Sequence, residues 1–387
     1  MLNFEFKNPT KIIFGKGEIH KLSKEIPQNA KILMLYGGGS IKSNGIYDQV
    51  KSALSDFDLS EFGGIPANPE YSVLLDALKV IQEKNIDYLL AVGGGSVIDG
   101  TKFLAAASKY DGDEPWDILT QKIRFFEGDA LPFATVLTLP ATGSEMNSGY
   151  VISRRETKEK LSSGGPGLFP QFSIMDPEVI RSIPKKQIAN GIADAYSHVL
   201  EQYMTYPTAA TLQERIMESI MITLQEVAPK VLADEFDYDA AANFMWCCTM
   251  ALNGLISKGV PTDWAVHSMG HELTALFGID HARTLAIIAP SHYRFNMENK
   301  IGKLCQYADR VWNISGENAK EKAEFGIKKM EEFFQGMGIP TRLSGYVEEY
   351  EGTAEKIQQS FTERNWILGE RKNIGPDEVL EIVKMSY

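Results

Sequence analysis

The sequence predicts an α/β domain over residues 1–180 followed by an all-helical domain over residues 181–387. Before about residue 180, short β-branched or aliphatic runs alternate with helical stretches and Gly-rich turns, which is typical of a parallel sheet with helices on both faces. After Pro184, apolar residues recur three and four positions apart almost to the end, which indicates helices. A chain of 387 residues also suits roughly two domains. We expect a cleft between the domains to bind the ligand.

The strands expected in the first domain are short and mostly apolar. Two of them, Lys31–Tyr36 and Tyr88–Val92, are almost continuously apolar, as buried parallel strands are. The full set of expected strands is Phe4–Phe6, Ile12–Phe14, Lys31–Tyr36, Tyr88–Val92 and Ala134–Leu139. We expect the first two to pair across the Asn8–Pro9 turn, and helices to cover Val73–Glu83 and Val97–Ser108.

The second domain is expected to be a set of amphipathic helices. The expected helices are Pro184–Met204, Leu212–Leu232, Ala240–Ile256, Trp264–Phe277, Ala282–Phe295 and the charged surface helix Ala319–Gln335. The aromatic side chains of Phe125, Phe126, Trp246 and Trp264 are interpreted as core.

Composition excludes several classes of protein. Hydrophobic residues make up 44% and charged residues 23%, so disordered, collagen-like and coiled-coil chains are excluded. Asp and Glu outnumber Lys and Arg by 51 to 39, a net charge of −12, and no run of clustered Lys and Arg is present. An acidic chain of this kind repels phosphate backbones and anionic lipid, so we expect neither a nucleic-acid nor a membrane partner.

Three cysteines are too few and wrongly spaced for a disulfide framework or a zinc finger. Cys247 and Cys248 are adjacent, and Cys305 stands alone. We expect all three to be small buried side chains. The first residues lack the apolar core of a signal peptide, and no segment has the roughly 18 apolar residues of a membrane span. The expected location is cytoplasmic.

The sequence GGGS occurs twice, at Gly37–Ser40 and at Gly93–Ser96, each time after an expected strand. The second copy also opens a helix, whose first N–H groups attract anions. Glycine allows the backbone to approach a phosphate closely. Two such turns in one sheet favour phosphate binding over plain βα turns, although neither is the GxGxxG fingerprint.

The first glycine-rich turn carries no acid. NAD-binding sites commonly place a carboxylate near the adenine ribose, where it repels a 2′-phosphate. Here Gly39 is followed by Ser40 and Lys42, which offer a hydroxyl and a cation. This arrangement favours NADP, with the alternative that Lys42 is only a solvated side chain.

Histidines gather in the helical half at helical spacing. Asp194 and His198 are four apart, as are His267 and His271, so each pair lies on one helix face, and His281 follows a turn. Each alone would be a hydrogen-bonded core side chain, but one Asp and three His can form a metal site. Such a ligand set suits Fe²⁺ or Zn²⁺. Ser268 after His267 excludes an HExxH protease.

The segments GGGSVIDGTK and TLPATGSE, together with the Asp194–His198 and His267–His271–His281 series, resemble the iron-containing (group III) alcohol dehydrogenases. YGGGSIK and DHARTLAI are similar to the NADP-dependent aldehyde reductase and butanol dehydrogenase branch. The resemblance implies a Rossmann-like α/β N-terminal domain and an all-α C-terminal domain, as in dehydroquinate synthase-like folds. It also implies a homodimer.

The resemblance implies roles for particular residues. The implied metal ligands are Asp194, His198, His267 and His281, and His271 is implied beside the nicotinamide as a proton-relay residue. The implied cofactor-binding residues are Gly38, Gly39, Ser40, Asn68, Gly94, Gly95, Ser96, Asp99, Thr138, Thr142 and Lys160. Many members carry Asp where Gly39 stands and Gly where Ala282 stands, so this chain departs from them at the nucleotide and near the substrate.

The expected function is a metal-dependent NADP(H)-linked alcohol dehydrogenase or aldehyde reductase acting on small aldehydes and primary alcohols. The metal, Fe²⁺ or Zn²⁺, would act as a Lewis acid on the carbonyl oxygen. One alternative is a dehydroquinate synthase-like lyase that uses NAD transiently, but only Lys258 and Arg283 lie near the histidines in sequence to hold a substrate phosphate. Another is a non-catalytic nucleotide sensor.

Overall fold

The computed structural model describes residues 1–387, which form two compact units. The sheet unit comprises residues 7–184 and 236–253. The helical unit comprises residues 1–6, 185–235 and 254–387. The boundary expected at residue 180 groups residues 1–6 with the sheet and 236–253 with the helices, whereas the compact units group both segments the other way.

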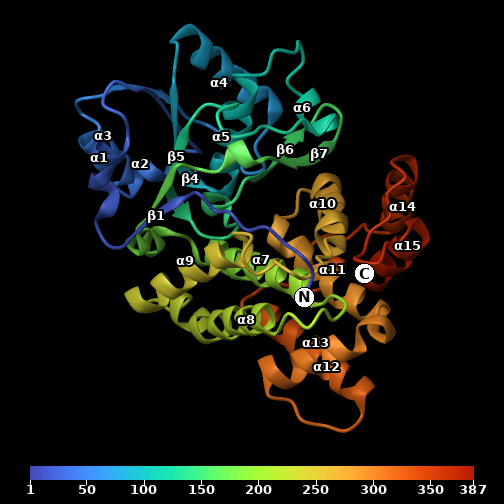
Figure 1. The fold of residues 1–387 in the computed structure, drawn as a ribbon. Helices are drawn as coiled ribbons and strands as arrows, with labels where there is room; N and C mark the ends of the chain where they lie inside the picture. Colours follow the sequence, from blue (N-terminus) through green and yellow to red (C-terminus); the bar gives the residue numbers. More distant parts are fainter. The chain divides into compact units, whose positions relative to one another are not determined.

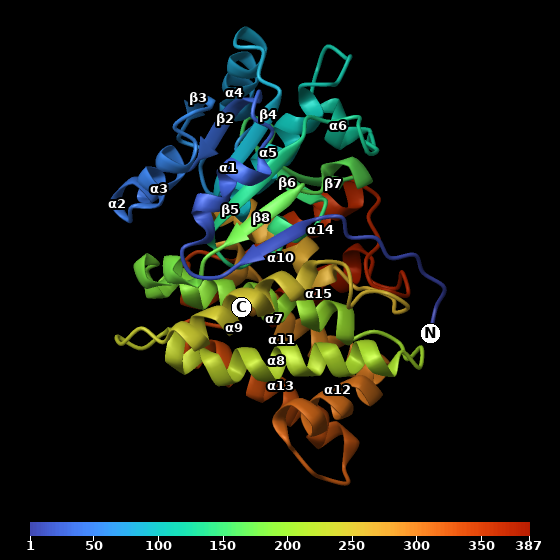
Figure 2. The same cartoon turned by 60° about the vertical axis from the view of Figure 1, so that its left-hand side comes forward.

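A six-stranded parallel sheet forms the centre of the sheet unit. Its strand order is β1-β8-β5-β4-β2-β3, and Figure 2 shows the strands running side by side from β3 toward β8. The strands are β1 Lys11–Phe14, β2 Lys31–Tyr36, β3 Asp58–Phe62, β4 Tyr88–Gly94, β5 Phe133–Leu139 and β8 Phe172–Met175. Strands β2, β4, β5 and β8 are buried along most of their length, which explains their continuous apolar character.

Helices connect the parallel strands. They are α1 Leu22–Glu25, α2 Ser40–Ser43, α3 Ile46–Ala53, α4 Tyr71–Glu83, α5 Gly95–Ala107 and α6 Asp117–Thr120. The later segment adds α9 Tyr238–Leu252, which follows the last strand of the sheet. An antiparallel hairpin of β6 Gly149–Arg154 and β7 Glu159–Gly164 interrupts the path from β5 to β8. Since β3 lies on one side of β2 and β4 on the other, the strand order reverses between β2 and β4. Ligands bind at such a point in open α/β sheets, at the carboxyl ends of the strands.

The expected pairing of Phe4–Phe6 with Ile12–Phe14 is wrong. Residues 4–6 form no strand, and β1 pairs in parallel with β8, Ile12 opposite Ser173. The side-chain amide of Asn8 donates hydrogen bonds to the Met146 and Asn253 carbonyl oxygens at 2.8 and 3.0 Å. These long-range bonds tie Asn8 to distant segments, so β1 pairs with β8 and not with residues 4–6.

The helical unit is built almost entirely of helices. They are α7 Lys185–Tyr203, α8 Thr211–Val231, α10 Ala265–Phe277, α11 His281–Phe295, α12 Met297–Trp312, α13 Ala319–Gly336, α14 Thr353–Glu363 and α15 Pro376–Met385. Figure 1 shows α12 beside α13 and α14 beside α15. The six helices expected after Pro184 are present with ends shifted by a few residues, α9 among them, while α12, α14 and α15 were not expected.

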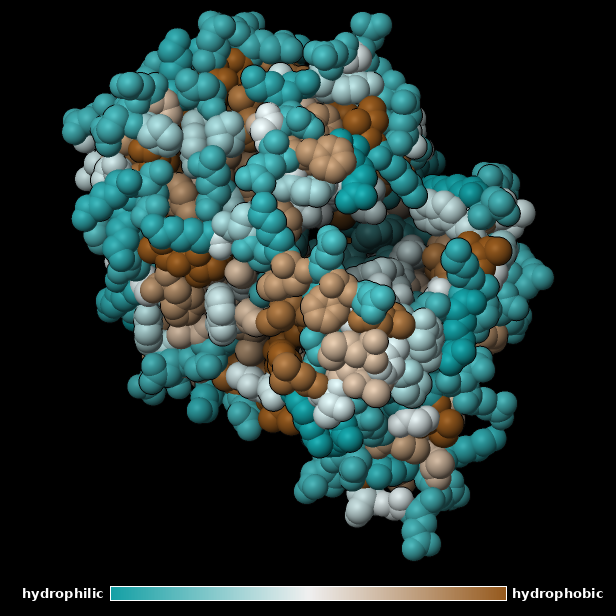
Figure 3. Space-filling view, in the orientation of Figure 1, coloured by the Kyte–Doolittle hydropathy of each residue, from teal (hydrophilic) through white to brown (hydrophobic).

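Helix α7 is the most enclosed element of the helical unit. Its residues from Ile188 to Tyr203 are all buried. Helix α13, in contrast, buries a single stripe that includes Ala323, Ile327 and Phe334. Hydrophilic residues dominate the surface over α12 and α13 in Figure 3, as expected for the charged helix. No helix combines the length and apolar character needed to cross a bilayer.

Two expectations about burial are partly wrong. Cys247 and Cys248 are buried, but Cys305 is half-buried. Phe125 is buried and Trp264 is half-buried, whereas Phe126 and Trp246 are exposed. Phe126 lies in a turn closed by the Asp129 carboxylate, which accepts its backbone N–H at 2.8 Å, and Trp246 packs edge-on against the exposed Phe14.

Candidate functional site

Three helices of the helical unit bring a carboxylate and imidazoles together. Asp194 comes from α7, His267 from α10 and His281 begins α11. One ligand atom from each of these residues lies within 4.8 Å of the others. Asp194 and His267 are buried and His281 is half-buried, so the group is largely shielded from water. Such a set can bind a divalent transition metal.

His198, one turn after Asp194 on α7, lies at the side of this group. Its ring stacks on His267 with centroids 4.7 Å apart, and its Nδ1 lies 4.0 Å from Asp194 Oδ2. The residue is buried and Nδ1 has no hydrogen-bond partner. Burial lowers the pKa of His198 to about 4, so the ring is neutral at neutral pH. A neutral buried imidazole with an unused nitrogen fits a metal ligand.

His271 lies beside the group, one turn after His267 on α10. Its ring centroid is 4.9 Å from that of His281 and 6.4 Å from that of His267. The side chain is half-buried. The structure therefore brings together all four implied ligands and the implied proton-relay residue.

Glu201 supports this cluster and was not expected from the sequence. It follows His198 by three positions on α7, and one carboxylate oxygen contacts Nδ1 of His267. The Val266 N–H donates to the other oxygen at 2.7 Å. Burial raises the pKa of the Glu201 carboxyl well above its ordinary value, and the nearby Asp263 adds to this effect. The only available signal was its position on the same helix as two implied ligands.

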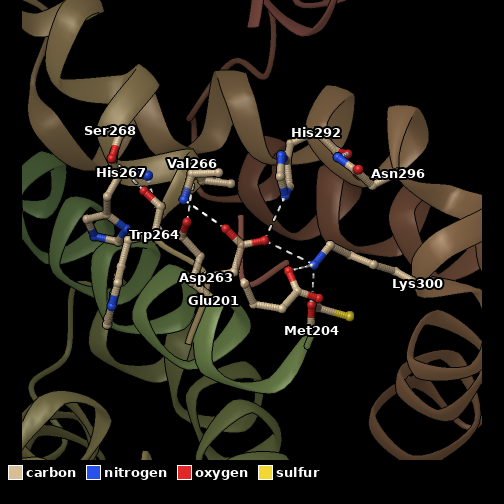
Figure 4. A network of polar contacts seen from close by, with 12 residues as sticks. Glu201, Met204, Asp263, Trp264, Val266, His267, Ser268, His292, Asn296 and Lys300 are labelled. Atoms are coloured by element: carbon tan, nitrogen blue, oxygen red, sulfur yellow. Dashed lines mark hydrogen bonds and ion pairs between the residues drawn. The ribbon is translucent and has the colours of Figure 1, made fainter. Parts of the chain in front are cut away.

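A second buried carboxylate, Asp263, supports the start of α10. Its side chain accepts the Ala265 N–H at 3.0 Å and contacts Lys300 Nζ at 3.0 Å and His292 Nε2 at 3.5 Å. Figure 4 shows these side chains converging. Burial alone would raise the pKa of the Asp263 carboxyl, but His292 and Lys300 lower it well below its ordinary value. Lys300 also binds Glu370 at 2.8 Å, so this network reaches the C-terminal segment.

The candidate phosphate site lies in the sheet unit, where β4 ends and α5 begins. A Cβ on Gly95 would stand 2.5 Å from Thr142 Oγ1, and one on Gly94 would stand 2.8 Å from Leu139 Cβ. Both glycines are therefore required by close packing of α5 against the end of β5, where Thr138 also lies. The first N–H groups of α5 have no partner within the helix and suit an anion.

Side chains distant in sequence meet at the same end of the sheet. The Asn68 N–H donates to Ser96 Oγ at 3.2 Å, and Lys160 Nζ donates to Asn68 Oδ1 at 3.0 Å. Asn68 adopts the left-handed conformation, with φ of 56°. The structure thus joins three of the implied cofactor residues into one contact chain.

Asp99 and Lys102 tie α5 to the segment after β5. Asp99 accepts hydrogen bonds from Ser144 Oγ at 2.6 Å and from the Val151 N–H at 3.0 Å. Lys102 Nζ donates to Ser144 Oγ at 2.7 Å and to the Gly149 carbonyl at 2.8 Å. Burial lowers the pKa of Lys102 to about 8. The Asp99 carboxylate is therefore occupied by hydrogen bonds within the protein. Lys102, the last residue of GGGSVIDGTK, was not predicted to have a role.

The first glycine-rich turn follows β2. Gly39 has a φ of 100°, which favours glycine, and precedes the short helix α2. Gly38 and Ser40 are exposed or nearly so. Lys42 Nζ lies 5.2 Å from the ring centroid of Tyr36 and 5.0 Å from that of Tyr47, so an exposed cation is held beside the turn.

Comparison with known proteins matches this chain to one family along almost its whole length. Residues 9–177 match the family described as iron-containing alcohol dehydrogenase. Residues 188–387 match the C-terminal region of the Fe-containing alcohol dehydrogenase family.

Individual relatives are similar over most of both chains. The NADPH-dependent aldehyde reductase YqhD of Escherichia coli (strain K12) is 48% identical over 347 residues, 89% of each chain. A probable NADH-dependent butanol dehydrogenase 1 of Bacillus subtilis (strain 168) is 42% identical over 394 residues, covering 100% of both. A crystal structure of E. coli K-12 YqhD aligns with a TM-score of 0.97 and 44% identity, covering 100% of this chain and 99% of that chain.

Proposed function

Because this chain belongs to the iron-containing alcohol dehydrogenase family, we propose that it is a metal-dependent, NADP(H)-linked alcohol dehydrogenase that interconverts small aldehydes and primary alcohols. The observation that carries the proposal is the cluster of Asp194, His198, His267 and His281 within the helical unit. Relatives named as an aldehyde reductase and a butanol dehydrogenase support the substrate class.

Asp194, His198, His267 and His281 would hold one Fe²⁺ or Zn²⁺ ion. Neutral imidazoles and a carboxylate suit these ions, and the low pKa of His198 keeps its ring unprotonated. When bound, the metal supplies a Lewis acid for a carbonyl oxygen and NADPH supplies the hydride. The protein residues orient the reactants and move the proton.

His271 is the proposed proton-relay residue. It lies beside His281 and His267 without belonging to the closest group of ligand atoms, and it is half-buried. An imidazole in this position can pass a proton near neutral pH. Replacing His271 by Ala should lower turnover much more than metal content, as measured by steady-state kinetics beside elemental analysis. Unchanged turnover would remove His271 from the relay.

The proposed cofactor site is the carboxyl end of the parallel sheet. Gly94, Gly95 and Ser96 would contact the pyrophosphate, with Asp99, Thr138 and Thr142 alongside, and Asn68 with Lys160 would close one side. Gly38, Gly39 and Ser40 would face the adenine ribose. The preference for NADP rests on the absence of an acid at Gly39 and on the cation of Lys42, since the relatives' names include both NADPH and NADH.

The experiment that tests this function follows NADPH oxidation with butanal. It is run beside NADH and repeated after chelation and after readdition of Fe²⁺ or Zn²⁺. We expect metal-dependent turnover that favours NADPH, and steady consumption would also exclude the lyase and sensor alternatives. Turnover that favours NADH would overturn the cofactor preference, and no turnover with either metal would overturn the activity.

We also propose a homodimer located in the cytoplasm. Leu2, Phe4 and Phe6 are each 44–49% exposed, an apolar segment that a second copy would cover. The three free cysteines fit a reducing compartment. Light scattering after gel filtration tests the dimer, and a monomer mass would refute it.

A further inference from the structure

We propose that Glu201 is a positioning residue for the metal centre: its carboxylate holds the His267 ring by Nδ1, so that Nε2 is the nitrogen presented to the metal. This inference deepens the proposed function, on which it rests for the identity of His267 as a ligand. Nothing in the family resemblance assigned a role to Glu201.

The contacts of Glu201 all converge on the first turn of α10. Its carboxylate accepts the Val266 N–H at 2.7 Å and the His267 N–H at 3.3 Å, and it contacts the Nδ1 of His267. Helix α10 begins at Ala265, so these backbone N–H groups have no partner within the helix. One side chain therefore caps α10 and fixes the ring that α10 carries.

The contact with the carboxylate determines which nitrogen of the His267 ring is available to a metal. Both Glu201 oxygens accept backbone N–H groups, so the carboxylate acts as an acceptor; Nδ1 of His267 then donates its proton to it, and Nε2 keeps its lone pair. The Glu201 side chain is only 2% exposed, so water does not compete for these contacts. A carboxylate behind a ligating imidazole sets both the orientation of the ring and its basicity.

The neighbouring elements hold Glu201 against the start of α10. Glu201 follows His198 on α7, so the same helix supplies two implied ligands and the support of a third. The Asp263 carboxylate accepts the N–H of Ala265, the first residue of α10, and binds Lys300. The N–H of Asp263 donates to the Glu201 carbonyl at 2.8 Å. The Asp263 carboxylate contacts the Ala265 N–H, Lys300 and His292, whereas the Glu201 carboxylate contacts the His267 ring, so the positioning role belongs to Glu201.

The chain offers a matched control in Glu218 on α8 of the same unit. Its carboxylate is 4% exposed and accepts hydrogen bonds from Tyr203 Oη at 2.8 Å and from Arg310 at 3.0 Å. None of its hydrogen-bond partners is an implied metal ligand. Glu201→Gln and Glu218→Gln therefore make the same chemical change at equal burial, and only the first touches His267.

The experiment measures Zn²⁺ affinity by competition with a chromophoric chelator, without cofactor or substrate. We expect Glu201→Gln to weaken Zn²⁺ binding by about 10- to 100-fold, as loss of an outer-shell carboxylate does, while Glu218→Gln stays within about twofold of wild type. Glu201→Asp keeps the charge and should recover part of the affinity. In turnover assays kcat should fall with the KM for NADPH unchanged. Equal affinity of Glu201→Gln and wild type, or equal loss in both Gln variants, would overturn the proposal.

A second measurement keeps the inference independent of variant folding and of the proposed function. Nitrogen-15 NMR of metal-free wild type, with the His267 signal identified from a His267→Gln sample, reports which ring nitrogen is protonated. Protonation at Nδ1 supports the positioning role, and protonation at Nε2 overturns it. If wild type binds no metal at all, the proposed function fails, but this tautomer still decides the role of Glu201.

Discussion

The candidate phosphate site and the metal cluster differ in what forms them. In the sheet unit, the phosphate site depends on side chains that are missing: Gly94 and Gly95 leave space that Leu139 and Thr142 fill. In the helical unit, the metal cluster depends on side chains that are present and on buried carboxylates that support them. The first site therefore presents backbone N–H groups, and the second presents oriented lone pairs.

This difference determines how each site should fail. Adding atoms should damage the phosphate site, because a Cβ has no room between α5 and β5. Removing atoms should damage the metal cluster, because each ligand is a single side chain. Substitutions at each site can test whether loss of cofactor binding and loss of metal occur separately.

The largest expected effect is that of Asp194→Ala. Loss of the only carboxylate in the cluster should remove most bound metal and lower kcat/KM by on the order of 1,000-fold, since Lewis-acid stabilisation contributes several kcal/mol. Elemental analysis and aldehyde reduction assays measure both. The control is Asp309→Ala, a 57% exposed carboxylate on α12, which should leave both quantities unchanged. Full metal content in Asp194→Ala would show that the cluster is not the metal site.

The next effect is expected for Gly95→Ala. The new Cβ would stand 2.5–3.1 Å from three atoms of Thr142, and overpacking of this kind costs about 1–3 kcal/mol. We expect the KM for NADPH to rise about 10- to 100-fold with metal content unchanged. Gly302→Ala, on α12 with open space around it, is the control and should bind NADPH normally. A loss of metal in Gly95→Ala would break the separation between the two sites.

The pH dependence of stability should identify Lys102. Burial lowers its pKa from an ordinary 10.5 to about 8, so between these values the unfolded chain binds more protons and stability rises with pH. Relative to Lys102→Met, wild type should gain up to about 3 kcal/mol of unfolding free energy between pH 8 and pH 10.5. Urea titrations at several pH values measure this difference. A difference that falls with rising pH would show that Lys102 is charged and stabilised by Asp99.

The smallest effect is expected for Lys42→Ala. Lys42 is exposed beside the Gly39 turn, and an exposed cation facing a phosphate contributes little after solvent screening. We expect the KM for NADPH to rise about two- to fivefold and that for NADH to stay constant. Lys79→Ala, which removes another exposed cation of the same unit, is the control. Equal changes for both cofactors would remove Lys42 from recognition of the 2′-phosphate.

Local sequence patterns were enough to predict the strands and helices whose buried residues recur at regular spacing. The apolar runs of β2, β4 and β5 and the periodicity of α7, α10 and α11 are confirmed. The partner of β1 was missed because Asn8 is held by residues 138 and 245 positions away, and no local pattern records such bonds. Strand β3, with the sequence DLSEF, was missed because its alternation is weak and its residues are only half-buried.

The residues that support the metal cluster and the phosphate site could not be predicted from the sequence, for a related reason. A glutamate on a helix is ordinary, and Glu201 stands out only because His267, 66 positions away, meets it inside the protein. Lys102 looks like a solvated helix residue until Ser144 and Gly149 enclose it. Their roles depend on which helices pack together.

Local sequence was sufficient for the periodicities, the two glycine-rich turns, and the spacing that places Asp194 with His198 and His267 with His271 on shared helix faces. These features depend on backbone geometry within a few residues, which the chain carries locally. Three further features are visible only in the folded chain: α7, α10 and α11 meet around one set of ligand atoms, Glu201 contacts the His267 ring, and Asp99 accepts a hydrogen bond from Ser144. Such contacts arise from packing between distant segments, where burial removes water and leaves each polar group to find a partner within the protein.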